Sequence, residues 1–140
     1  MIHGLWVIKK QGECLFERYF GAVKQAPNIS NLLSAIHTFS DSMTGESIRS
    51  ITLENILFRY KVSRNIIFVL STDREDDVTE TLDGLEIKFW TEFKQPITEI
   101  DKNKLENFAK EADELIKKYE RKKEIEELKD KLRALERELV

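Results

Sequence analysis

The chain has 140 residues and a formal net charge of −3, and charged residues make up 35% of it. This length suits one domain with an appendage, and a mildly acidic chain without a basic block argues against nucleic acid as a partner. The single cysteine excludes an internal disulfide, and no apolar run approaches the roughly 20 residues that span a bilayer.

Two strands are expected first, over residues 2–9 and 13–20. They are separated by a short polar gap that contains Gly12, which is a hairpin signal. The first strand is apolar at successive positions, so both of its faces are apolar. We therefore expect it near the centre of a sheet that is covered on both sides.

A helix is expected next, after a connector over residues 21–27. Asn28 or Ser30 would cap its start and Gly45 would end it. The apolar residues at helical spacing, which should form its buried stripe, are Ile29, Leu32, Leu33, Ile36, Phe39 and Met43. His37 lies at the edge of this stripe and is expected to be partly exposed.

Three more strands are expected over residues 48–53, 56–62 and 66–70. The last of these is continuously apolar and rich in β-branched residues, which predicts a second central strand. A helix over residues 78–93 follows, with an apolar stripe of Leu82, Leu85, Phe89 and Phe93. Pro96 then breaks the chain.

From Asp101 onward the chain is one charged helical stretch without Gly or Pro, in which basic and acidic residues are equal in number. A first heptad set, which we expect to lie on the sheet, is Leu105, Phe108, Ala112, Leu115 and Tyr119. A second set, the tail seam, is Ile125, Leu128, Leu132, Leu135 and Leu139.

The two heptad sets are out of phase, because the step from Tyr119 to Ile125 is one residue short of a heptad. The tail seam has nothing of its own left to pack on, and an isolated helix of two heptads is marginal in water. We therefore expect it to pair with itself or with a partner helix. The alternative is a solvated helical extension that frays.

The order strand, strand, helix, three strands, helix, helix resembles the longin domain, the profilin-like module of trafficking SNAREs and related adaptor subunits. The resemblance covers about residues 1–119. It rests on a first strand that begins almost at Met1, on the hairpin glycine Gly12, and on the three-strand meander over residues 48–70. It implies an α+β fold with a five-stranded antiparallel sheet, the first helix on one face and the later helices on the other.

The expected organisation is a longin-like head over residues 1–96, a helix that continues the head over 97–119, and a coiled-coil-like tail over 120–140. The resemblance implies a non-enzymatic protein–protein contact in membrane trafficking or small-GTPase-linked assembly. The implied partners are a small GTPase or a SNARE or other coiled-coil helix. It also implies a cytoplasmic location, with or without peripheral attachment to membranes, and we expect a homodimer.

Two alternatives stay open. One is a roadblock-like scaffold subunit, a relative in shape that usually opens with a helix where this chain opens with a strand. The other is a small enzyme whose site is built from surface residues. A pocket where titratable residues converge would favour the enzyme, whereas a bare sheet edge or an apolar groove would favour the interaction module.

No catalytic residue, metal site or cofactor site is expected. Cys14 lacks a nearby His to activate it, and no glycine-rich loop is present to cradle a phosphate. The acidic run over residues 73–77 neither alternates its carboxylates nor carries the glycine of a calcium loop. We interpret this run as negative charge that interacts favourably with the positive, N-terminal end of a helix dipole.

Overall fold

The computed structural model describes residues 1–20, 29–94 and 100–139. The strands are β1 (Ile2–Lys9), β2 (Cys14–Tyr19), β3 (Ser50–Thr52), β4 (Ile56–Ser63) and β5 (Ile66–Asp73). The helices are α1 (Ile29–Thr44), α2 (Thr79–Glu92) and α3 (Lys102–Glu138). The fold is α+β in the order ββαβββαα, as the sequence predicts.

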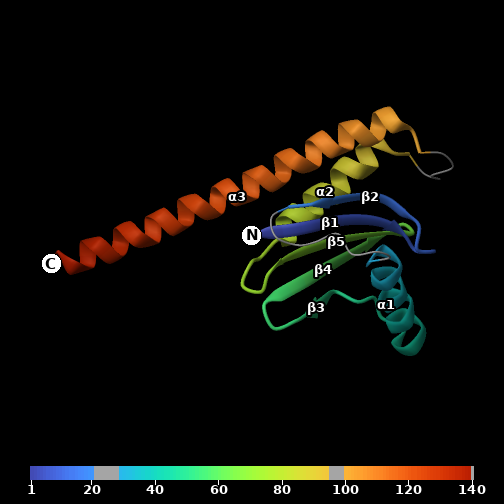
Figure 1. Ribbon diagram of the computed structural model, residues 1–140, viewed down its shortest axis with the longest axis horizontal. Coiled ribbons are helices and arrows are strands. Elements are labelled where there is room, and N and C mark those ends of the chain that lie inside the picture. The colour runs from blue at the N-terminus through green and yellow to red at the C-terminus, as the bar shows by residue number, and fades with distance from the viewer. Residues whose placement is uncertain (21–28, 95–99, 140) are drawn as a thin grey trace.

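The strands form one antiparallel sheet in the order β2-β1-β5-β4-β3 (Figure 1). β1 and β5 pair with a neighbour on both sides, and seven of the eight residues in each are buried. A strand that is apolar on both faces is most stable where other elements cover both faces. The prediction that these two strands are central is confirmed.

The sheet separates two hydrophobic cores, because side chains alternate between its faces. Leu5 and Phe68 point into the core under α2 and α3. Trp6, Ile67 and Tyr60 point into the smaller core under α1. Figure 1 shows α1 on one side of the sheet and the other two helices on the opposite side, as the resemblance implies.

Aromatic packing joins the sheet to both α2 and α3. The ring of Phe89 on α2 lies 5.4 Å from that of Phe68 on β5 and 5.4 Å from that of Phe108 on α3. All three side chains are fully buried. Asp101 caps α3 by accepting a 2.8 Å hydrogen bond from the Asn103 N–H, which fixes where the long helix starts.

Residues with positive φ lie at three turns or helix ends of the described chain. The β4–β5 turn places Arg64 and Asn65 at φ of 50° and 71°, the positive values that a two-residue hairpin turn needs. Gly12 in the β1–β2 turn has φ of 105°, and Gly45 after α1 has φ of 72°. The N–H of Gly45 donates to the Asp41 carbonyl at 2.8 Å, which confirms the predicted end of the helix.

The predicted buried stripe of α1 is wrong in part. The buried residues of this helix are Leu33, Ser34 and His37, whereas Leu32, Phe39 and Met43 are exposed. Two hydrogen bonds accompany this rotation: the Ser34 hydroxyl donates to the Lys10 carbonyl at 3.0 Å, and the Tyr60 hydroxyl donates to the Leu33 carbonyl at 3.1 Å. His37 is therefore buried, not partly exposed as expected.

Two further differences concern element bounds. The strand expected over residues 48–53 is only β3, Ser50–Thr52. Beyond it, β4 has no neighbour strand on that side within residues 1–20, 29–94 and 100–139. The expected connector over residues 21–27, the capping residue Asn28 and the chain break at Pro96 lie outside the described residues.

Candidate interaction surfaces

The tail seam lies on one helix and is exposed. Its five side chains are between 47% and 87% exposed, and none belongs to either hydrophobic core of the described residues. Figure 1 shows the second half of α3 extending well beyond the sheet. The seam therefore presents an apolar stripe to solvent on an otherwise charged helix, and the structure brings it to no other described element.

The first half of α3 packs on the head instead. The residues of α3 that are buried between this helix and the sheet are Phe108, Ala112 and Ile116. Leu105 and Tyr119 pack at the margin of the same core. The heptad set expected here omitted Ile116, which helical spacing from Ala112 would have identified. The first heptad set thus serves the fold and only the second set is free.

A polar cluster fastens α3 to the head where the two sets change phase. Asp76, whose side chain is 2% exposed, accepts a hydrogen bond from the Met1 α-ammonium, and its Oδ1 lies 2.6 Å from the Lys123 Nζ. One turn of α3 earlier, Glu120 Oε1 accepts the Ile2 N–H at 2.8 Å. Sequence spacing carried no signal for these contacts, because they join residues far apart in the chain.

The electrostatics of this cluster favour its charged form. Burial acts to raise the pKa of Asp76, but hydrogen bonds from Lys123 and the Met1 ammonium outweigh it and hold the pKa below its usual range. The hydrogen bond to Asp76 raises the pKa of Lys123 in turn. Burial, followed by the charge of Asp76, raises the pKa of Tyr119 beside it. The cluster is a structural ion pair in a site that is partly shielded from solvent.

Two other carboxylates of the acidic run, Asp77 and Asp73, also have structural partners. Asp77 Oδ1 accepts the Thr79 N–H at 3.1 Å at the start of α2, and hydrogen bonds from Thr79 lower the pKa of Asp77. Asp73 Oδ1 lies 2.7 Å from the His3 Nε2. Among the described residues, no three His, Cys, Asp or Glu side chains gather into a group that could hold a metal ion.

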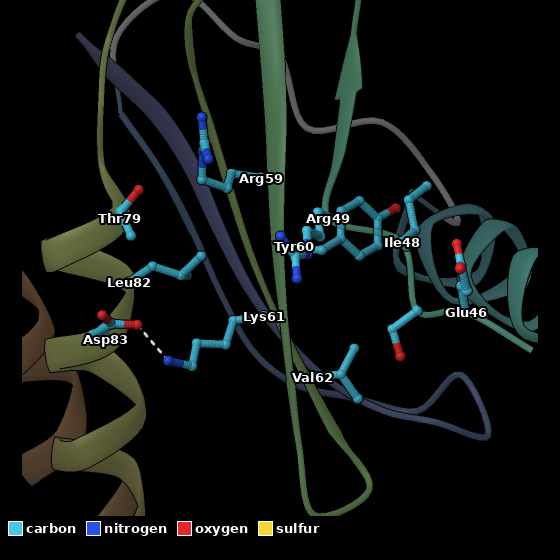
Figure 2. Close-up of a pocket in the computed structure, with 11 residues that line it drawn as sticks. Glu46, Ile48, Arg49, Arg59, Tyr60, Lys61, Val62, Thr79, Leu82 and Asp83 are labelled. Carbon is cyan, nitrogen blue, oxygen red and sulfur yellow. Dashed lines mark hydrogen bonds and ion pairs between the residues drawn. The ribbon is translucent and has the colours of Figure 1, made fainter.

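A cavity of about 990 Å³ opens along β4, on the side where β3 stops short. Figure 2 shows the side chains that line it, which include Glu46, Ile48, Arg59, Lys61, Thr79 and Asp83. Lys61 Nζ donates to Asp83 Oδ1 and lies 3.8 Å from Glu86 Oε1. Lys61 and Asp83 thus form an ion pair at this cavity, and Glu46, Arg49 and Arg59 line it as well.

This ion pair is poorly suited to acid–base chemistry near neutral pH. The hydrogen bond to Asp83 raises the pKa of Lys61, so the amine stays protonated and cannot serve as a general base. Burial raises the pKa of Tyr60, whose hydroxyl is bonded to the Leu33 carbonyl. Burial, followed by the charge of Glu17, also raises the pKa of the Cys14 thiol to about 11, which leaves it a weak nucleophile.

A second exposed apolar surface lies on the head. Leu32, Phe39 and Met43 of α1 are 57%, 67% and 69% exposed. Elsewhere on the head, the outer edge of β3 has no strand partner among the described residues. Helical spacing identifies this apolar stripe in the sequence, and we predicted that it would be buried. A sequence alone does not show which face of a helix packs against the sheet.

Comparisons with known proteins give only distant structural likenesses. No family model and no curated protein sequence matches the chain. The structure of the gliding protein mglB from Thermus thermophilus is 15% identical with a TM-score of 0.46, and covers 55% of this chain and 64% of that one. This chain thus spans less than two thirds of that protein's length.

A structure of MglB with a tetrameric arrangement is 14% identical with a TM-score of 0.49, and covers 81% of this chain and 79% of that one. Similarities of this degree assign neither an activity nor a partner to the chain. Separately, none of the helices among the described residues combines the length and apolar character that a membrane crossing requires.

Proposed function

We propose that this chain is a non-enzymatic protein–protein interaction module of longin type, acting in membrane trafficking or small-GTPase-linked assembly. The observation that carries the proposal is the tail seam, an apolar stripe left in water on a helix that projects from the head. The α+β order ββαβββαα, which the longin resemblance implies, is consistent with this proposal.

The tail seam supports helix pairing on energetic grounds. Burying a Leu or Ile side chain contributes roughly 1.5–3 kcal/mol, and five such side chains follow heptad spacing here. Pairing two stripes removes both from water, which offsets the entropy lost on association. We expect the tail to pair with the tail of a second copy, and a SNARE-like or other coiled-coil helix would satisfy the same stripe.

Binding is also the better use of the head. Lys61 stays charged in its ion pair and the Cys14 thiol stays protonated, so neither offers a ready base or nucleophile at neutral pH. The free edge of β3 and the exposed face of α1 are instead surfaces that a protein partner would cover. In this proposal the protein is cytoplasmic, with or without peripheral attachment to membranes.

The test replaces two seam residues, Leu128→Asp with Leu135→Asp, and measures mass by sedimentation at micromolar concentration. The double variant should sediment as a smaller species than the wild type, because two buried carboxylates would oppose pairing. Arg137→Asp is the matched control, since it changes the net charge by the same two units on the helix face opposite the seam and should leave the mass unchanged.

Two outcomes would contradict self-pairing of the tail. A wild type that is monomeric throughout the micromolar range would assign the stripe to a different partner. A double variant with the mass of the wild type would show that the head alone holds the copies together.

A further inference from the structure

We propose that the tails of two copies of this chain pair antiparallel, with Leu128 of one copy opposite Leu139 of the other. The inference rests on the function proposed above, because it concerns the same tail seam. It adds the direction and the register of the pair, and it places the two heads at opposite ends of the paired helices.

The seam faces away from the head. Lys123 marks the side of α3 that contacts the head, since its Nζ lies 2.6 Å from Asp76 Oδ1. Successive helix residues are about 100° apart, so the five seam side chains lie between about 120° and 200° around the helix from Lys123. The six-residue step from Tyr119 to Ile125 produces this rotation, whereas a full heptad would have kept the seam within about 20° of the head-facing set. A second helix can therefore lie along the seam without meeting the head.

Charged residues flank the seam on both sides. The heptad places Ile125, Leu132 and Leu139 at one core position and Leu128 and Leu135 at the other. The side chains next to the core positions are all exposed, and such residues set the orientation of paired helices. They are Lys122, Lys129 and Glu136 on one flank, and Glu124, Lys131 and Glu138 on the other.

An antiparallel pair matches these charges. Reversing one helix brings the same flank of both copies together. When the leucines of the two seams face one another in the proposed register, Lys129 meets Glu136 of the second copy, and Lys131 meets Glu138 on the other flank. A twofold axis repeats each contact, so every flanking contact within the leucine layers joins opposite charges.

The charges also select the register. Moving one helix by a heptad would set Glu124 against Glu138 of the second copy, and Lys131 against its own counterpart. Like charges in such positions oppose pairing. The proposed register leaves Ile125 outside the leucine layers, but Ile125 is the least exposed seam residue, at 47%. It therefore leaves less apolar surface in water than any other seam residue would.

A parallel pair would bring cations together above the seam. Continued toward the head, the heptad places Lys118 and Arg121 at core positions, with Lys117 and Lys122 on the flanks. All four are exposed, and each would meet a cation of the second copy. In the antiparallel register they lie beyond Leu139 of the second copy. The favourable pairs available lower in a parallel seam are matched by those of the antiparallel pair, so these cations decide the direction.

The experiment uses single cysteines in the full chain carrying Cys14→Ser, which removes the free thiol. One chain carries Leu128→Cys and another carries Leu139→Cys. An equimolar mixture in a glutathione redox buffer should form a disulfide-linked dimer, because the two positions share a layer. Either chain alone should form roughly tenfold less, because its two cysteines would lie about 16 Å apart along the helices, farther than a disulfide reaches.

The matched control mixes the Leu128→Cys chain with a chain carrying Arg137→Cys, which lies at a similar height but on the face opposite the seam. A Leu128→Cys chain that links to itself more than to the Leu139→Cys chain would show parallel tails. That result would overturn this inference and leave tail pairing intact. A mixture that forms no more dimer than the control would show unpaired tails, and would contradict the proposed function as well.

A charge exchange tests the flanks separately, with the disulfide yield of the same mixture as the readout. Lys129→Glu in both chains should lower the yield by roughly tenfold, because two attractive contacts become repulsive. Adding Glu136→Lys should restore it, since the exchanged charges attract again across an antiparallel pair. In a parallel pair the second change would add a further repulsion. A double exchange that pairs no better than Lys129→Glu alone would overturn the antiparallel register.

Discussion

At the scale of single residues, Asp76 shows how one side chain ties distant segments together. It lies just before α2, yet it pairs with the amino end of β1 and with Lys123 on α3. Removing one partner from a buried ion pair leaves an uncompensated charge, which is far more costly than losing an exposed pair. The carboxylate therefore holds the long helix in place at its last contact with the head.

Asp76→Asn should lower the free energy of unfolding by about 2–4 kcal/mol near neutral pH, measured by urea denaturation. Asp130→Asn is the matched control, because Asp130 is exposed and its nearest cation, Arg133, lies 3.7 Å away. The control should change stability by less than about 0.5 kcal/mol. Equal effects in the two variants would show that the cluster does not hold α3.

The same pair predicts an acid dependence. The pKa of Asp76 is lower in the folded chain than in the unfolded one, so its stabilisation is fully present above the unfolded pKa of about 3.9. It is lost as the pH falls through the folded pKa. The stability difference between wild type and Asp76→Asn should therefore be constant near neutral pH and shrink below about pH 4.

At the scale of elements, β5 contributes side chains to both hydrophobic cores. Phe68→Ala should lower the free energy of unfolding by about 3–5 kcal/mol, because this ring is fully buried and packs 5.4 Å from Phe89. Ile87→Ala on the exposed face of α2 serves as the control and should cost less than about 0.5 kcal/mol. A comparably small loss for Phe68→Ala, measured by urea denaturation, would show that the strand is misplaced.

Some elements could be placed correctly from the sequence, whereas others could not. β1 and β5 were predictable because apolar residues at successive positions leave no face for solvent. The rotation of α1 was not, because Leu32, Phe39 and Leu33 are equally apolar in the sequence. Hydrogen bonds from Ser34 and Tyr60 to distant segments accompany the observed face, and pattern analysis does not register such bonds.

At the scale of the whole molecule, α3 joins the head and the tail without a break. A chain that ends at residue 124 keeps Glu120 and Lys123, and should unfold in urea with the midpoint of the full chain at low protein concentration. A chain that ends at residue 119 loses both contacts and should be less stable by about 1–3 kcal/mol.

Both truncated chains should still unfold cooperatively, since the cores lie within the shorter one. Failure of the longer chain to fold would show that the tail seam stabilises the head. Equal stability of the two chains would show that the contacts of Glu120 and Lys123 contribute nothing.

The sequence by itself determined the elements, their order, the two-sided burial of β1 and β5, and the heptad spacing of the tail seam. These features depend on local periodicity and turn residues, which a linear pattern records directly. Only the tertiary structure decided the turn of α1, the short β3 that leaves β4 uncovered, the Asp76–Lys123 pair and the burial of His37. Each of these depends on contacts between residues far apart in the chain, so each is set by how whole elements pack.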